Sequence, residues 1–221
     1  MEIIKKQIAY NKSKRTTAIK YIVIHDTGNE NKGADALAHF NYFNGGNRNS
    51  SADFFVDDKS IIQVNDYKKY YTWAVGDGKG KYGITNANSI SIEICVNEDS
   101  NYKEAYLKTI ELTKLLMKEL NIPAERVVRH YDASRKNCPA SMSSNGWSYW
   151  QDFKNRISGD DKMAKCEFND IKGHYAEKYI QKLLDLGVVK GDGKGYFNPD
   201  KTLTRAEAAV MIANVLTILG K

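Results

Sequence analysis

Residues 21–27 read Tyr-Ile-Val-Ile-His-Asp-Thr, and residues 88–94 read Asn-Ser-Ile-Ser-Ile-Glu-Ile. The first stretch is rich in β-branched residues and is closed by a turn, so it predicts a short buried strand with His25 at its end. The second alternates isoleucine with polar residues, which predicts a strand with two different faces. One face is expected to carry Ile90, Ile92 and Ile94, and the other Ser91, Glu93 and Cys95.

Helix and hairpin patterns surround these two stretches. The spacing predicts a helix over residues 33–44, a hairpin over 53–64, a longer helix over 104–120 and a last short strand over 127–130. Strands and helices mixed in this way indicate an α/β domain, so we expect a central mixed β-sheet flanked by helices. The helix residues expected to be buried are Ala36, Leu37, Phe40 and Phe43 on the first helix, and Leu112, Leu115, Leu116 and Leu120 on the second.

A polar run at residues 158–162 separates this region from a differently patterned C-terminal part. We therefore predict a domain over residues 1–157, a linker over 158–165 and a small all-α module over 166–221. The boundary divides a large core-forming region from a much shorter one.

Two main helices are predicted in the C-terminal module. The first spans residues 175–186, and Gly187 stands where a left-handed C-terminal cap is expected. The second opens at residues 204–207, Thr-Arg-Ala-Glu, which form a capping box. Because about 60 residues in two helices make a marginal core, we expect the module to pack against a partner. The residues expected to be buried on the last helix are Ala209, Ile212, Ala213 and Leu216.

Composition limits the class of protein. The 221 residues are 42% hydrophobic and 27% charged, which supports a folded core and excludes a disordered chain. No apolar run approaches the ~20 residues of a membrane span. The net charge is +6, with 23 basic against 18 acidic residues in residues 1–159, which suits an anionic surface. No arginine-rich stripe or zinc-finger spacing favours nucleic acid, so we expect no nucleic-acid partner.

The N-terminus and the cysteine count bear on the compartment. The first residues carry no apolar core of roughly 7–15 residues before a small-residue cleavage site, so we expect synthesis in the cytoplasm without a signal peptide. Three cysteines are few for a disulfide scaffold, and their odd number leaves one unpaired. We therefore interpret the cysteines as free thiols or metal ligands.

Three residues form a candidate metal site: His25, His130 and Cys138. Two imidazole nitrogens and one thiolate suit Zn²⁺, and three protein ligands leave the fourth position open, as in catalytic zinc sites. Spacing alone leaves the alternative open that His25 is a packed strand-end residue and Cys138 a small buried hydrophobe.

Three motifs carry a resemblance to a known family: residues 21–27, residues 88–94, and residues 129–139 with Arg-His-Tyr-Asp and Lys-Asn-Cys-Pro. Over residues 1–157 the chain resembles the type-2 N-acetylmuramoyl-L-alanine amidases, the fold shared with phage endolysins and peptidoglycan recognition proteins. The resemblance implies that His25, His130 and Cys138 bind zinc, that Glu93 is catalytic and that Lys136 assists.

The chemistry implied by this resemblance is hydrolysis of the amide between the lactyl group of N-acetylmuramic acid and L-alanine, in Gram-positive peptidoglycan. Zn²⁺ would polarise the carbonyl and acidify water. Glu93 would take the proton of the water and pass it to the leaving amine, and Lys136 would lie near the developing oxyanion. Without the resemblance, Glu93 reads as a solvent-facing strand residue and Lys136 as a solvated loop cation.

Two positions depart from the pattern of the family. Members often carry histidine where this chain has Asp53 and where it has Ala74. Neither position is a metal ligand in the family, so zinc binding is not affected. We expect the change to bear on substrate contact, because a methyl group stands at Ala74 in place of an imidazole.

The C-terminal module resembles a single S-layer homology repeat over about residues 166–216. Such repeats bind anionic secondary cell-wall polymers, and they typically occur three together. By this resemblance the polymer-contacting or site-shaping residues are Asp170, Tyr175, Gly187 and Arg205. Tyr175 stands where the family commonly has tryptophan. A lone repeat leads us to expect a homo-oligomer, such as a trimer, that rebuilds the three-repeat unit.

Together these features predict an endolysin-like peptidoglycan hydrolase that is released from the cytoplasm and acts outside the membrane, on the cell wall. The alternatives are a bacterial autolysin with the same activity, a non-catalytic peptidoglycan-binding protein and an S-layer structural protein. Glu93 beside a full ligand set disfavours the binding protein. One repeat in a chain of this length disfavours the structural protein.

Overall fold

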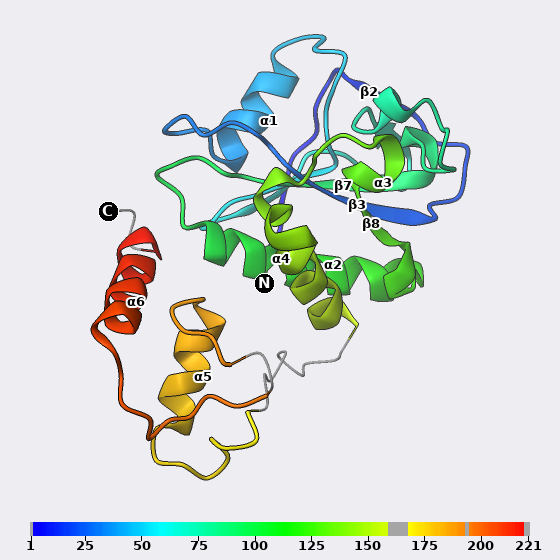
Figure 1. The fold of residues 1–221 in the computed structure, drawn as a ribbon. Helices are drawn as coiled ribbons and strands as arrows, with labels where there is room; N and C mark the ends of the chain where they lie inside the picture. Colours follow the sequence, from blue (N-terminus) through cyan, green and yellow to red (C-terminus); the bar gives the residue numbers. More distant parts are fainter. Residues whose placement is uncertain (1, 159–167, 193–194, 219–221) are drawn as a thin grey trace. The chain divides into compact units, whose positions relative to one another are not determined.

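The computed structural model describes residues 2–158, 168–192 and 195–218. The chain divides into two compact units, residues 1–161 and 162–221 (Figure 1). The predicted linker, 158–165, lies outside the described residues apart from Ser158. None of the helices in the described part is both long enough and apolar enough to cross a membrane.

A six-stranded sheet forms the centre of the first unit, in the order β1-β5-β4-β7-β3-β8. The strands are β1 (Ile4–Lys5), β3 (Tyr21–Asp26), β4 (Phe54–Val56), β5 (Ile61–Gln63), β7 (Ser89–Ile94) and β8 (Val127–Arg129). Only the β4–β5 hairpin is antiparallel within this sheet, and the other neighbours run parallel. The predicted mixed sheet is confirmed. A short antiparallel pair, β2 (Lys12–Lys14) with β6 (Tyr70–Thr72), lies beside it.

Helices cover both faces of the sheet, as Figure 1 shows. The helices are α1 (Ala36–Asn44), α2 (Tyr102–Leu120), α3 (His130–Ser134) and α4 (Ser144–Ile157). The main core joins α2 and α4 to the isoleucine face of β7, whereas Ala36 of α1 packs on Phe55 and Cys95 across the sheet. The predicted alternation is therefore confirmed: the isoleucines of β7 lie in the main core, and Cys95, directly after the strand, lies in the cluster on the other side.

Two helix predictions are corrected by the structure. The first helix begins at Ala36 rather than at residue 33, because the Asp35 carboxylate accepts a hydrogen bond from Ala38 N at 2.8 Å and caps the helix. Leu37 and Leu115 were expected to be buried, but they are 44% and 43% exposed. On α2 the buried side includes threonines such as Thr109, so a leucine count misplaces it. Helix α4 was not predicted.

Asp53 lies in the core rather than at a cleft. Its carboxylate is fully buried and accepts hydrogen bonds from Asn65 Nδ2, Thr72 Oγ1 and Ser91 N, each at 2.9 Å. Burial raises its pKa, while these hydrogen bonds and the charge of Arg15 act in the opposite direction. Asp53 thus joins β4 to β6 and β7, and the expectation that it bears on substrate contact is replaced by a structural role.

The second unit contains α5 (Glu177–Asp185) and α6 (Arg205–Ile218). Its small core consists of Phe168, Ile171 and Ile180, and Leu184 of α5 packs against it. The predicted capping box is confirmed: Glu207 N donates to Thr204 Oγ1 at 3.1 Å, and Thr204 N donates to Glu207 Oε2 at 2.8 Å.

The expected burial on α6 is wrong. Ile212 is 61% and Leu216 42% exposed, and Ala209 and Ala213 are exposed as well. The helix is apolar on nearly every side, so its sequence does not define a single buried stripe. The core of this unit is too small to cover such a helix.

Candidate metal centre

The candidate metal centre lies where three parallel strands end. In the register of β3 and β7, His25 is the partner of Glu93, so both side chains leave the same face of adjacent strands. His130 directly follows β8 as the first residue of α3. Because the carboxyl ends of parallel strands meet at one edge of the sheet, residues far apart in sequence meet here.

A short reversal returns Cys138 to the same place. Helix α3 ends at Ser134 and is capped by Arg135, whose φ of 71° is left-handed and whose N–H donates to Tyr131 O at 2.8 Å. Tyr131 N then donates to Cys138 O at 2.9 Å. This hydrogen bond closes the loop, so the thiol comes back beside the imidazole of His130.

The donor atoms of His25, His130 and Cys138 lie within 4.8 Å of one another, and all three residues are buried. The two Nδ1 atoms of the histidines are 3.1 Å apart, and Cys138 Sγ is 3.9 Å from His25 Nδ1. Donors about 2.0–2.3 Å from one Zn²⁺ ion in tetrahedral geometry lie about 3.3–3.7 Å from each other. Two imidazoles and one thiol at these separations fit Zn²⁺, with a fourth position open.

The protonation of these groups also fits a metal. Burial, with the nearby His130 and the charge of Lys136, lowers the pKa of His25 well below its usual value, so its imidazole is neutral and has a free lone pair. Burial and then the charge of Glu93 raise the pKa of the Cys138 thiol. A metal ion must therefore displace the thiol proton when it binds.

Glu93 stands beside this cluster with an unusual environment. Its Oε1 is 3.8 Å from His25 Nδ1, and its side chain is 18% exposed. Its Oε2 is buried, with no hydrogen-bond partner in the part of the chain that the structure describes. Burial first, and then the charge of Asp26, raise the pKa of Glu93 to about 8, and Lys136 opposes this rise. A carboxyl with such a pKa can exchange a proton near neutral pH.

Lys136 lies on the exposed turn between α3 and Cys138. Its positive charge acts on the pKa values of His25, Glu93 and Cys138. The structure thus brings together His25, His130, Cys138 and Glu93, and the charge of Lys136 acts on three of them.

Asp77 is a further polar residue of the site, and it was not predicted. Its Oδ1 is 2.8 Å from His130 Nε2, on the opposite side of the ring from Nδ1. Burial would raise its pKa, but the hydrogen bond and charge of His130, with further hydrogen bonds, lower it overall. In the sequence, Asp77 stands in a Gly-Asp-Gly turn at residues 76–78. This pattern predicts a turn but does not indicate that its carboxylate contacts His130.

Ala74 lies two residues before that turn. Its backbone N–H donates to Asn86 Oδ1 at 3.0 Å, and its side chain packs against the cluster of Val23, Val75 and Ala133. Its methyl group is thus partly buried against the sheet.

The residues predicted to bind the wall polymer lie on loops and helix ends of the second unit. Asp170 accepts hydrogen bonds from Phe197 N at 3.0 Å and Asn198 N at 2.6 Å, so its carboxylate organises a loop. Gly187 has φ of 72° after α5, as predicted for a C-terminal cap. Tyr175 is 85% exposed and Arg205 is exposed at the start of α6. No hydrogen bond or ion pair joins these four residues within the described ranges.

Comparison with known proteins is consistent with this geometry. The family model for N-acetylmuramoyl-L-alanine amidase matches residues 15–141, more than half of the chain, and the S-layer homology domain model matches residues 167–209. N-acetylmuramoyl-L-alanine amidase CwlH of Bacillus subtilis (strain 168) is 39% identical over 145 residues, which cover 66% of this chain and 55% of that protein. Amidase XlyA of the same strain is 38% identical over 139 residues, covering 63% and 44%.

A solved structure of a mutant endolysin from Bacillus subtilis is similar in fold and sequence. It has a TM-score of 0.64 and 38% identity, and the match covers 71% of this chain and 98% of that chain. The chain spans about half the length of the curated relatives named above. The match to the endolysin structure, in contrast, covers nearly all of that solved chain.

Proposed function

Because the chain belongs to the N-acetylmuramoyl-L-alanine amidase family, we propose that it hydrolyses the amide bond between N-acetylmuramic acid and L-alanine in Gram-positive peptidoglycan. One observation carries the proposal most directly. Three buried side chains with the donor atoms that suit zinc converge within 4.8 Å, and a carboxylate with a raised pKa lies 3.8 Å from one of them. A binding protein has no need for such a carboxylate.

His25, His130 and Cys138 would hold the metal ion through Nδ1, Nδ1 and Sγ. When bound there, Zn²⁺ would supply Lewis acidity that polarises the scissile carbonyl and makes water a better nucleophile at neutral pH.

Glu93 acts as the general acid and base. Its ionised carboxylate accepts a proton from the attacking water, and the protonated carboxyl then donates that proton to the nitrogen of the leaving L-alanine. The raised pKa supports the second step, because a carboxyl that titrates near 8 holds the proton long enough to deliver it. The low polarity around Oε2 supports both steps, since no protein group in the described part competes for that oxygen.

Lys136 places a positive charge near the cluster. As the carbonyl oxygen gains negative charge in the transition state, this ammonium stabilises it, and the effect is strengthened by partial exclusion of water. Lys136 is exposed, so its side chain can approach a substrate that lies over the cluster.

The test is hydrolysis of purified Gram-positive cell walls. We expect clearing that a chelator abolishes and Zn²⁺ restores, with release of free L-alanine amino termini and no new reducing sugars. Glu93→Gln should lose about 10²–10⁴-fold in kcat with its zinc content unchanged, whereas Glu111→Gln, on the exposed side of α2, should match the parent. Zinc-independent clearing, or intact walls with the zinc-loaded protein, would contradict the proposal.

The second unit is proposed to hold the enzyme on the wall through an anionic secondary polymer. The match to the S-layer homology domain supports this role. Exposed Arg205 offers a cation and exposed Tyr175 an aromatic ring, the side chains that suit anionic glycans. Wall pull-down should weaken for Arg205→Glu but not for Lys201→Ala, which removes a cation from the loop before α6. Equal binding of Arg205→Glu and the parent would count against it.

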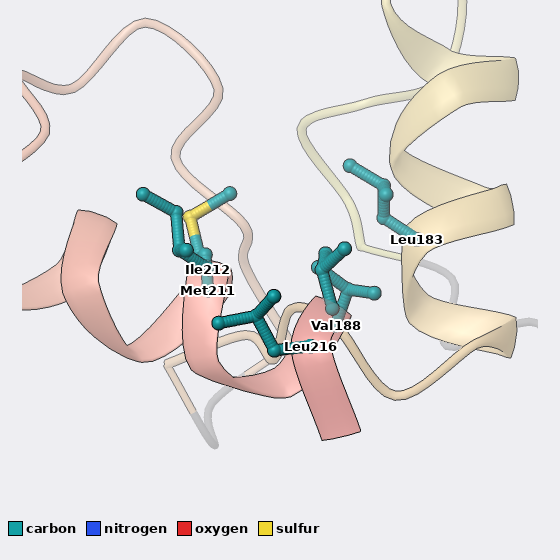
Figure 2. Close-up of a pocket in the computed structure, with 6 residues that line it drawn as sticks. Leu183, Val188, Met211, Ile212 and Leu216 are labelled. Atoms are coloured by element: carbon teal, nitrogen blue, oxygen red, sulfur yellow. The ribbon is translucent and has the colours of Figure 1, made fainter. Parts of the chain in front are cut away.

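We further propose that copies of the chain associate through α6. Figure 2 shows the apolar side chains that line a pocket beside this helix. The pocket has a volume of about 260 Å³. Its lining residues are Leu183, Val188, Met211, Ile212, Val215 and Leu216. Exposed side chains of this kind on one helix are typical of an interface, and the unit holds a single repeat.

Sedimentation equilibrium tests this association. We expect an oligomer for the parent chain and a monomer for Ile212→Asp, because a charge in an apolar interface is costly to bury. Leu115→Asp is the matched control, since Leu115 is a comparably exposed apolar residue on α2. A parent chain that stays monomeric at its highest soluble concentration would exclude self-association.

A further inference from the structure

The Asp77 carboxylate lies within hydrogen-bond distance of the His130 ring nitrogen that points away from the other metal-binding groups. Its Oδ1 lies 2.8 Å from His130 Nε2, while His130 Nδ1 lies 3.1 Å from His25 Nδ1. A carboxylate can only accept a hydrogen bond, so Nε2 of His130 must carry a proton here. In a neutral imidazole, Nδ1 is then left with a free lone pair directed at the cluster.

We propose that Asp77 is a positioning residue that fixes the Nε2–H tautomer and the ring orientation of His130 and thereby strengthens metal binding. The inference rests on the proposed zinc site. A hydrogen-bond acceptor on the outer nitrogen makes an imidazole a better ligand and holds its ring in place.

Hydrogen bonds within its own segment fix the position of the Asp77 carboxylate. Asp77 lies in the turn η1 (Gly76–Gly78), and Gly78 N donates back to Asp77 Oδ1 at 3.0 Å. Asn86 Oδ1 holds the start of this segment by accepting from Val75 N at 2.7 Å. The carboxylate is therefore held by its own turn before any contact with the histidine.

Gly78 allows this turn to approach α3 closely. A Cβ at Gly78 would lie 2.1 Å from the carbonyl oxygen of Ala133, which no side chain can tolerate. Because Ala133 and His130 belong to the same short helix, the glycine sets the distance between Asp77 and the imidazole. Asp77 and Gly78 thus both determine the hydrogen bond between the Asp77 carboxylate and His130.

The two histidines differ in this respect. His25 Nε2 is buried and has no hydrogen-bond partner among the described residues. In the described part of the chain, a carboxylate lies within hydrogen-bond distance of the outer nitrogen of His130 and not of that of His25, so removal of Asp77 acts on one of the two metal-binding histidines.

Without the Asp77 carboxylate, the outer nitrogen of His130 loses the acceptor that fixes its proton. Neutral His130 can then take either tautomer.

Two measurements test the proposal. Zinc affinity is measured by competition with a chromophoric chelator, and the histidine tautomers by ¹⁵N NMR of the metal-free protein at about pH 8, where an unperturbed imidazole is neutral. Asp77→Ala should lose about 10–100-fold in zinc affinity, and the Nε2–H tautomer of His130 should give way to a mixture. Asp77→Asn, which keeps an acceptor without the charge, should fall between the parent and Asp77→Ala.

Asp200→Ala is the matched control. Asp200 also faces a histidine, with Oδ1 3.4 Å from His174 Nε2, but it lies in the second unit. Its loss should leave zinc affinity unchanged. The urea midpoint of each variant in chelator checks that the metal-free fold is retained.

Unchanged zinc affinity in Asp77→Ala, an unchanged His130 tautomer, or an equal loss in Asp200→Ala would each overturn the proposal. A parent protein that binds no zinc would instead contradict the proposed function. In that case the tautomer in the metal-free protein alone decides whether Asp77 orients His130.

Discussion

At the scale of single residues, Glu93 shows how catalysis and stability oppose each other. Its carboxyl is largely buried, and Oε2 has no hydrogen-bond donor in the described structure. An ionised carboxylate in such a place is costly, which is why burial raises its pKa to about 8. The same feature that suits proton transfer therefore works against the folded state.

This opposition predicts a pH-dependent gain in stability for Glu93→Gln. The folded-state pKa of about 8 lies above the ordinary value of 4.5, so the folded state binds the proton more tightly than the unfolded state. The contribution of Glu93 to stability is thus full below about pH 4.5, and it is lost as the pH rises toward 8. In chelator, Glu93→Gln should equal the parent near pH 4.5 and exceed it at pH 8 by up to a few kcal/mol.

Urea unfolding across this pH range measures the difference. Glu111→Gln serves as the control, because Glu111 is exposed on α2 and should give a curve parallel to that of the parent. If Glu93→Gln also ran parallel to the parent at every pH, the carboxyl would not be strained in the fold.

At the scale of elements, Asp53 is the residue that ties three strands together. It precedes β4, and its carboxylate accepts from Thr72 in β6 and from the backbone of Ser91 in β7. The Asp53 carboxylate is thus a junction between β4, β6 and β7, which no single turn connects. Its position next to the strand that carries Glu93 links the stability of the sheet to the geometry of the site.

Removal of the Asp53 carboxylate should destabilise the whole first unit. Asp53→Ala leaves the donors Asn65, Thr72 and Ser91 N buried without their acceptor, and we expect a loss of about 3 kcal/mol in the free energy of unfolding. Chemical denaturation followed by tryptophan fluorescence measures this loss. A change as small as that of Glu111→Ala would refute the role of Asp53 as a junction.

At the scale of the whole molecule, charge governs the approach to the wall. The chain carries a net charge of +6, with 23 basic against 18 acidic residues in residues 1–159, the part that holds the metal centre. Attraction of a cationic protein to an anionic polymer is long-ranged and is screened by salt. The second unit adds attachment, so capture and hydrolysis involve different parts of the chain.

Binding of the full chain to purified walls should therefore weaken as ionic strength rises from about 0.05 M to about 0.5 M, over which the Debye length falls several-fold. Turnover of a small uncharged muramyl-peptide substrate should change little over the same range. Co-sedimentation with walls and a soluble-substrate assay make the comparison. Wall binding that is insensitive to salt would show that charge does not govern capture.

Much of the fold could be predicted from local patterns. The strand at residues 21–26, the alternating strand around Glu93 and the capping box at Thr204 were all identified, because each depends on neighbours within a few residues. Burial on α1, α2 and α6 was predicted less well. Leu37, Leu115 and Ile212 are exposed, since burial depends on what packs against a helix and not on its own periodicity.

The amino-acid sequence by itself determined which side chains could bind a metal, through the motifs of His25 and Cys138, and which carboxylate could act beside them, through the motif of Glu93. Only the tertiary structure decided that they meet. The parallel register pairs His25 with Glu93, and one backbone hydrogen bond from Tyr131 returns Cys138 to them. It also decided that Asp77 holds His130, a contact between residues 53 positions apart. Such contacts arise from strand pairing and loop closure over long separations, which no local sequence pattern encodes.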